Sequence, residues 1–237
     1  MNLCIILNCI FIYFMWNIYS IFIFNNEKAN IIIKKLDIDD KILEKINNSI
    51  HNYTIQQEFN RPLINFTHYS AESLPHSKMK KYIPKVVDYY NNIMPKIISN
   101  VLNKTVYPIN RKATCMLLSY NQENDYVDFH YDSGTSYGKY LINVIIHIKS
   151  TPNSCSNFQY MDYINGKRKI KKIKMSAYPK KSVLIYQGSN LFHGVTKQCK
   201  NQNRTVWIMS FVIDNKKPDI LNRIINYLYD IGYNGFN

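Results

Sequence analysis

The second half of the chain contains a succession of short strand-like segments with no helical segment between them. From residue 112 onward, apolar and aromatic residues alternate with polar ones, which is the period of a half-buried β-strand. Turn signals such as Asn165-Gly166 separate these segments. The expected strands cover 113–120, 126–131, 139–149, 157–163, 168–175, 182–186, 191–196 and 205–213. About eight consecutive strands favour a jelly roll, in which two sheets enclose a pocket.

Helical periodicity appears in the first half of the chain. Residues 36–50 predict a helix that Asp37 or Asp39 can cap, with isoleucine and leucine recurring every three or four positions. Residues 84–103 predict a longer helix, and the internal Pro95 is expected to kink or split it. We expect both helices to cover one face of the sheet.

The expected fold class is α+β and mainly β, a double-stranded β-helix flanked by N-terminal helices and a C-terminal helix. Residues 51–80 are expected to be irregular and polar, and 218–231 predict the closing helix. The expected units are a hydrophobic segment at 1–24, a helical support region at 30–111, a jelly-roll domain at 112–214 and a C-terminal helix at 215–237.

His130 and Asp132 lie two positions apart at the end of an expected strand. Side chains two positions apart on a strand leave the same face, so one imidazole and one carboxylate can hold one ion. A second imidazole must then come from elsewhere in the fold, and His193 is the candidate because it follows another strand and a turn. Two histidines and one carboxylate on one face of an octahedron form the site used by non-haem Fe(II) oxygenases.

The other four histidines are interpreted as ordinary side chains. His147 lies on the strand 139–149 and is expected to be packed rather than to ligate. His51, His68 and His76 lie outside the β-rich region.

Arg204 opens the apolar segment that ends the strand region. A buried arginine is costly unless it meets a carboxylate, and a dicarboxylate co-substrate is one natural partner because the guanidinium binds carboxylate in a bidentate manner. The alternatives are that Arg204 is a surface residue of an edge strand and that Lys197 or Lys200 takes this role.

The order Tyr120, His130-x-Asp132, His193-Gly194-Val195 and Arg204 resembles the 2-oxoglutarate- and Fe(II)-dependent dioxygenases, in particular their prolyl 4-hydroxylase-like branch. The resemblance covers roughly 112–214. It implies that His130, Asp132 and His193 hold Fe(II), that Arg204 binds the distal carboxylate of 2-oxoglutarate and that Tyr120 lines the co-substrate pocket. It further implies O₂ as co-substrate and ascorbate as an accessory reductant.

The same resemblance implies hydroxylation of a protein side chain, with a proline-containing peptide as the expected substrate. The nucleic-acid demethylase branch carries a second arginine six residues after the first, where this chain has Ser210. That branch is the alternative substrate class, and a catalytically silent jelly-roll binding module is the alternative outside enzymes. Substrate contacts are expected in the loops 51–80 and 133–138.

Residues 1–24 carry no charged side chain and are dominated by large apolar residues. About 20 apolar residues can span a bilayer, so the segment predicts a membrane anchor, with a cleaved signal sequence or a buried start as alternatives. The lysines that follow, from Lys28, would keep the body of the chain in the cytosol. The family resemblance instead favours the endoplasmic reticulum or secretory lumen, and we expect a membrane-associated protein on that side.

Net charge and cysteine content constrain the partners only weakly. The formal net charge of +14 accompanies heavy use of Asn, Ile, Lys and Tyr, as in an AT-rich coding sequence, so it is modest support for an acidic partner. The basic cluster, defined as residues 167–174, predicts an edge hairpin guarded by lysines; the alternative is a contact with an acidic peptide, nucleic acid or membrane surface. The five cysteines show no CxxC spacing, which disfavours both a disulfide framework and a zinc site.

Overall fold

The structure is a computed structural model of the chain. It describes residues 28–53, 55–61, 67–109, 114–132, 140–188 and 190–214, together with positions 8, 11, 12 and 15. The expected C-terminal helix at 218–231 lies outside the described residues.

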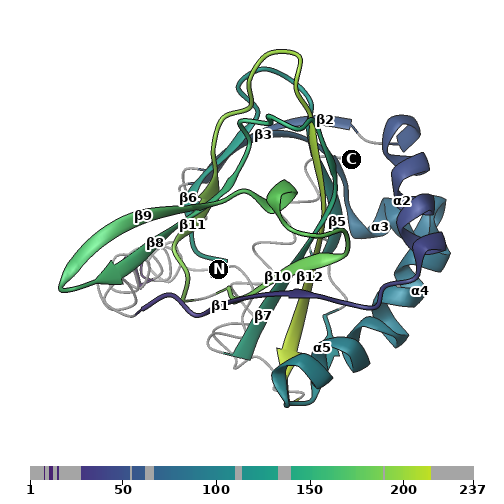
Figure 1. The fold of residues 1–237 in the computed structure, drawn as a ribbon, viewed down its shortest axis with the longest axis horizontal. Helices are drawn as coiled ribbons and strands as arrows, with labels where there is room; N and C mark the ends of the chain where they lie inside the picture. Colours follow the sequence, from purple (N-terminus) through teal and green to yellow (C-terminus); the bar gives the residue numbers. More distant parts are fainter. Residues whose placement is uncertain are drawn as a thin grey trace.

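One antiparallel sheet of 12 strands dominates the fold, and Figure 1 shows that it curls around an interior. The strand order is β1-β10-β7-β12-β5-β3-β6-β11-β8-β9, with β2 on β3 and β4 on β12. The strands are β1 Ile31–Lys35, β2 Ile55–Arg61, β3 Thr67–Leu74, β4 Val106–Pro108, β5 Cys115–Tyr120, β6 Tyr126–His130, β7 Leu141–Ser150, β8 Phe158–Ile164, β9 Lys167–Ile173, β10 Ser182–Gln187, β11 His193–Val195 and β12 Arg204–Ile213. This architecture confirms the predicted jelly-roll class, and each of the eight predicted strands has a counterpart.

Four helices cover the outer face of the sheet, on the right in Figure 1. They are α2 Asp40–Tyr53, α3 His76–Tyr82, α4 Pro84–Asn92 and α5 Met94–Leu102. Their apolar sides join Ile146 and Trp207 of the sheet in one buried cluster. The predicted split at Pro95 is confirmed, because the helix breaks at Ile93 and the proline lies in the first turn of α5, where its missing N–H costs nothing.

A second apolar cluster fills the inside of the curled sheet. Along β7, Val144 and Ile146 pack toward the helices, whereas Ile145 packs inward with Tyr120 and Val206. Both faces of the central strands are therefore buried, and an inward-facing polar residue on these strands meets protein or a ligand rather than bulk water.

The predicted irregular region 51–80 is wrong, because it contains β2, β3 and α3. β3 pairs with β2 along its whole length and also with β5 and β6. Polar side chains in β3 obscure the alternation of apolar and polar residues that is typical of a strand. One of them, Ser70, has a partner in the fold, because its hydroxyl donates to Asp125 at 2.8 Å. Backbone pairing from three neighbours outweighs the weak intrinsic preference of this segment.

Cys155 and Cys199 form a disulfide bond with their Cα atoms 5.5 Å apart. The cysteine spacing, which disfavoured a disulfide framework, did not predict this pairing. The two cysteines lie in separate loops, after β7 and before β12, and only the packing of these loops brings them together.

No helix among the described residues is long and apolar enough to cross a bilayer. This finding corrects the expected membrane association, and with it the expected location in the endoplasmic reticulum or secretory lumen. A spanning helix needs about 20 consecutive apolar residues, and most of the segment 1–24 on which that expectation was built lies outside the described residues.

One buried and one exposed isoleucine of the sheet give a matched pair of substitutions. Ile146→Ala removes a fully buried side chain between the helices and the sheet, and it should lower the free energy of unfolding by about 2–5 kcal/mol. Ile170→Ala makes the same change on β9, where the side chain is 55% exposed, and should stay within about 0.5 kcal/mol. Urea unfolding of both variants measures the difference; equal losses would contradict this placement of the core.

Candidate metal centre

Strand pairing brings the two predicted histidine ligands together. His193, the first residue of β11, is the direct cross-strand partner of His130, the last residue of β6. Directly opposed residues of an antiparallel pair project from the same face with their side chains adjacent. Asp132 lies two residues beyond His130, and the Asp132 amide donates to the Gly188 carbonyl at 3.0 Å. The three predicted residues therefore meet at one end of the sheet interior.

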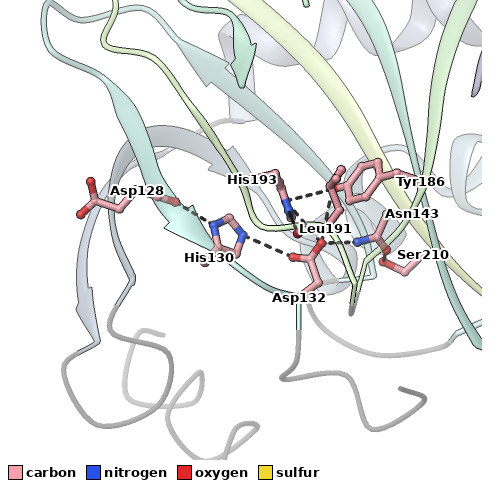
Figure 2. Close-up of polar contacts among 8 residues, drawn as sticks. All are labelled: Asp128, His130, Asp132, Asn143, Tyr186, Leu191, His193 and Ser210. Atoms are coloured by element: carbon pink, nitrogen blue, oxygen red, sulfur yellow. Dashed lines mark hydrogen bonds and ion pairs between the residues drawn. The ribbon is translucent and has the colours of Figure 1, made fainter. Parts of the chain in front are cut away.

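The three side chains converge on one point (Figure 2). The Nε2 atom of His130 lies 3.3 Å from one Asp132 carboxylate oxygen, and Nε2 of His193 lies 3.4 Å from the other. The donor atoms of all three residues lie within 4.8 Å of one another. Two imidazole nitrogens and a carboxylate at this separation can hold one metal ion, with several coordination positions left for other ligands.

Backbone carbonyls orient both imidazoles. Nδ1 of His130 lies 2.8 Å from the Asp128 carbonyl, and Nδ1 of His193 lies 2.9 Å from the Leu191 carbonyl. Since a carbonyl only accepts, each Nδ1 carries the proton, and each Nε2 lone pair faces the centre. This is how histidine ligands are commonly fixed for a metal.

Asp132 is held by a second layer of side chains that the sequence did not indicate. The Asn143 amide and the Tyr186 hydroxyl donate to the same oxygen, Oδ2, the latter at 3.3 Å. The Ser210 hydroxyl donates to the Asn143 carbonyl oxygen at 2.8 Å and fixes the amide orientation. A signal did exist, because Asn143 and Ser210 are polar residues inside otherwise apolar strands.

The charges of the three residues favour a cation at the centre. Burial opposes ionisation of Asp132, but His193, His130 and the Tyr186 hydroxyl together lower the pKa of its carboxyl. Burial lowers the pKa of His193 to about 4, so this imidazole is neutral at pH 7. Burial also disfavours charge on His130, but Asp132 and Asp128 outweigh it and raise the pKa of His130. One anionic and two imidazole donors suit a divalent metal.

Two glycines allow the close approach of these strands. A Cβ on Gly194 would lie 2.7 Å from the Val127 carbonyl oxygen, so only glycine lets β11 sit this near β6. A Cβ on Gly188 would lie 2.6 Å from the Asn143 amide nitrogen and 3.1 Å from Cβ of Asp132. Both glycines flank the cluster in sequence, and each makes room for backbone or a supporting side chain.

Arg204 is buried and 3% exposed, as predicted from its place in the sequence. It begins β12 directly opposite Tyr120 on β5 and Ser150 on β7. Its guanidinium carbon lies 5.4 Å from the centre of the Tyr120 ring, and Nη1 lies 3.5 Å from the Ser156 hydroxyl. No carboxylate is paired with it among the described residues. Burial lowers the pKa of Arg204, which shows how poorly the charge is solvated.

The alternative cations lie elsewhere. Lys197 and Lys200 are both exposed, and the Lys197 amine lies over the Tyr126 ring. Tyr120 is buried, and burial raises the pKa of its phenol to about 12. The structure therefore brings Tyr120 and Arg204 together, and the Tyr120 phenol acts electrostatically on Tyr186, which contacts the metal ligands.

Comparison with solved structures identifies the fold. An oxidoreductase of the 2OG-Fe(II) oxygenase family from Burkholderia pseudomallei has a TM-score of 0.57 and 9% identity, and the match covers 77% of this chain and 84% of that one. HygX from Streptomyces hygroscopicus, with nickel, 2-oxoglutarate and hygromycin B bound, has a TM-score of 0.56 and 8% identity, with coverage of 84% and 88%.

A prolyl hydroxylase from Trichoplax adhaerens, in complex with a hypoxia inducible factor peptide fragment, has a TM-score of 0.51 and 14% identity, with coverage of 90% and 93%. No protein-family model matches the sequence, and no curated protein matches it. The chain thus has the jelly-roll fold of the 2-oxoglutarate- and Fe(II)-dependent oxygenases, established by structure rather than by sequence.

Gly194 gives a direct test of the strand register. Gly194→Ala should push β11 away from β6, separate His193 from His130 and lower metal affinity about 10-fold or more, because ligand misplacement weakens metal binding. Titration with Ni(II) by calorimetry measures the affinity.

The matched control is Gly166→Ala in the turn between β8 and β9. There an added Cβ meets nothing within 4 Å, but φ is +73°, so backbone strain alone should cost about 1 kcal/mol of stability. Unchanged Ni(II) affinity is expected for this control. A Gly194→Ala protein that binds Ni(II) as tightly as the wild type would contradict the close approach of β11 and β6.

Proposed function

We propose that the protein is an Fe(II)- and 2-oxoglutarate-dependent dioxygenase. The observation that carries the proposal is the pairing of two features inside one jelly roll. One is the His130, Asp132 and His193 cluster with both Nε2 atoms preset inward. The other is a buried guanidinium with no carboxylate partner among the described residues, at Arg204. The similar structures include HygX with 2-oxoglutarate and a metal bound, which supports the assignment.

His130, Asp132 and His193 would hold Fe(II), and Arg204 and Tyr120 would bind 2-oxoglutarate. When bound, iron activates O₂ and couples the oxidative decarboxylation of 2-oxoglutarate to oxidation of the substrate. Arg204 binds the distal carboxylate through two parallel N–H bonds and fixes the co-substrate along the sheet interior. Ascorbate would serve as an accessory reductant.

The residues around the ligands keep the centre in one geometry. Asn143 and Tyr186 both donate to Oδ2 of Asp132, and Oδ1 faces Nε2 of His130 at 3.3 Å. The Tyr186 hydroxyl also lies 3.1 Å from Nε2 of His193, and its single proton cannot serve both acceptors at once. With Nε2 bound to a metal, this proton serves Asp132 alone. Apolar neighbours such as Phe158 and Leu191 exclude water from the inner face.

We propose that the oxidised group is a protein side chain, that of a prolyl residue in a peptide. The Trichoplax prolyl hydroxylase, which shares the fold, binds a peptide. A nucleic-acid demethylase is the runner-up, and it is disfavoured because Ser210 stands where that branch has a second arginine and is here bonded to Asn143. The proposed division of the chain keeps 112–214 as the oxygenase domain, with 30–111 as its support and 215–237 as a closing segment.

Release of succinate from 2-oxoglutarate tests the enzyme. The full chain with Fe(II), O₂ and ascorbate should produce succinate, and the double variant His130→Ala/Asp132→Ala should lose this activity because two of three ligands are gone. Proline-containing peptides should raise the rate. A folded protein that binds Fe(II) and 2-oxoglutarate no better than the double variant would leave only the silent binding module.

The response to peptides separates the substrate classes. Stimulation by prolyl peptides with a mass gain of one oxygen identifies the prolyl substrate. Succinate release that ignores such peptides but responds to methylated nucleic acid, with a strong dependence on salt, would favour the demethylase instead.

Substitution of Arg204 tests the co-substrate site. Arg204→Lys keeps the charge but loses the bidentate geometry, so KM for 2-oxoglutarate should rise about 10-fold or more with a smaller change in kcat. Lys197→Met and Lys200→Met remove exposed charges and serve as controls, with KM expected to stay within about twofold. A larger effect from either lysine than from Arg204 would assign the carboxylate to that lysine.

A further inference from the structure

Two buried polar atoms beside Arg204 have no hydrogen-bond partner. They are Nε2 of His147 and the hydroxyl oxygen of Ser150, both on β7. Buried polar atoms in folded proteins are almost always paired, so each orphan requires an explanation. Here both orphans lie on the strand that borders Arg204.

The strand register places both groups on the inner face. Ser150 is directly opposite Arg204, and His147 is directly opposite Val206, whose side chain belongs to the interior cluster. Ile146 and Ile148, on either side of His147, pack toward the helices instead. His147 therefore projects inward on the diagonal from Arg204, and the charge of Arg204 acts on its imidazole.

Arg204 has no carboxylate partner, and His147 and Ser150 have no hydrogen-bond partner, among the described residues. The strand register places these three side chains on the same inner face. Among the described residues, the guanidinium of Arg204 contacts the Ser156 hydroxyl and the face of Tyr120, and neither neutralises its charge. Leaving a buried cation and two buried hydrogen-bonding atoms unpaired costs several kcal/mol in all. An incoming carboxylate would satisfy all three, because it accepts up to four hydrogen bonds and carries the opposite charge.

His147 is neutral while this inner face lacks an anion. Burial, and then the positive charge of Arg204, lower its pKa to about 4. When the register of β10 with β7 is continued, Ser182 lies beside His147. β1 adds one cation on this face, the exposed Lys35, which lies opposite Ser182 and so two strand spacings, about 10 Å, from His147. η2 (Met175–Ala177) contacts β7 and contains no titratable group. Lys149 pairs with Thr205, on the opposite face of the sheet.

We propose that His147 is a second binding group for the distal carboxylate of 2-oxoglutarate, and that its imidazole takes up a proton when the carboxylate binds. The proposal rests on the proposed function, since it concerns the same co-substrate. In this arrangement Arg204 supplies two fixed donors and Ser150 a hydroxyl. His147, which the sequence predicted to be a packed side chain, supplies a third donor. The charge of this donor depends on the ligand.

The sign of the linkage follows from the charges. The ligand carboxylate cancels the repulsion from Arg204 and favours the imidazolium, so the pKa of His147 is higher in the complex than in the free protein. Affinity for 2-oxoglutarate should therefore be greatest at low pH and fall as pH rises through the raised pKa, reaching a plateau above it. The carboxylates of the ligand titrate at lower pH and do not contribute to this fall.

Calorimetry tests the proposal directly. The full chain is loaded with Ni(II), so that the metal ligands are already deprotonated, and titrated with 2-oxoglutarate at pH 6.5 in buffers of different ionisation enthalpy. The dependence of the measured heat on the buffer gives the number of protons taken up. We expect net proton uptake on binding, and an affinity that is several-fold weaker at pH 8 than at pH 6.

His147→Gln is the matched variant, because it keeps a donor and loses the titration. It should bind 2-oxoglutarate with no proton uptake and with little change between pH 6 and pH 8. Ser150→Ala should weaken binding by a few fold and leave the proton uptake intact. If His147→Gln does not fold, the nitrogen chemical shifts of His147 in the wild type, measured by NMR before and after addition of 2-oxoglutarate, report the same protonation.

Each outcome has a separate meaning. Tight binding of 2-oxoglutarate without proton uptake, or proton uptake that persists in His147→Gln, would overturn the role of His147 and leave the oxygenase assignment standing. Absence of any 2-oxoglutarate binding by the Ni(II)-loaded wild type would overturn the proposed function itself.

Discussion

The close backbone contact between β11 and β6 is the constraint on which the site depends. At Gly194 the two strands approach so near that a Cβ would lie 2.7 Å from the Val127 carbonyl oxygen. This approach fixes the register that sets His193 opposite His130, and the chain then turns so that the Asp132 carboxylate faces Nε2 of both histidines. A shift of one residue would turn every side chain of the strand to the other face and dismantle the cluster.

The interior contains opposite charges that do not neutralise each other. The carboxylate of Asp132 lies at the histidine cluster, and the guanidinium of Arg204 lies over the Tyr120 ring. Burying a guanidinium that has no carboxylate partner among the described residues costs free energy, and cores usually avoid it. The cost is understandable if each end is reserved for a ligand, a metal cation at one and a carboxylate at the other. Stability is then recovered when the ligands bind.

The chemistry of this site could be predicted because it follows local rules. The spacing of His130 and Asp132 depends only on the alternation of a strand, and the burial of Arg204 follows from the apolar run that it opens. The roles of Tyr186, Asn143 and His147 could not be assigned, because they depend on which strands are neighbours in the sheet. The polar strand β3 was missed for the same reason, and so was the pairing of Cys155 with Cys199: long-range contacts outweigh local preference.

Strand pairing through β8 connects the basic cluster on β9 to the candidate metal centre. β9 ends the sheet, and its lysines are exposed, as expected for an edge strand protected against pairing with another chain. Yet Lys171 lies opposite Tyr160 on β8, and Tyr160 lies opposite His193 on β11. Three directly opposed residues share one face, so Lys171 lies two strand spacings, about 10 Å, from the candidate ligand His193. The lysines that protect the edge therefore also contribute a positive potential near the candidate metal centre.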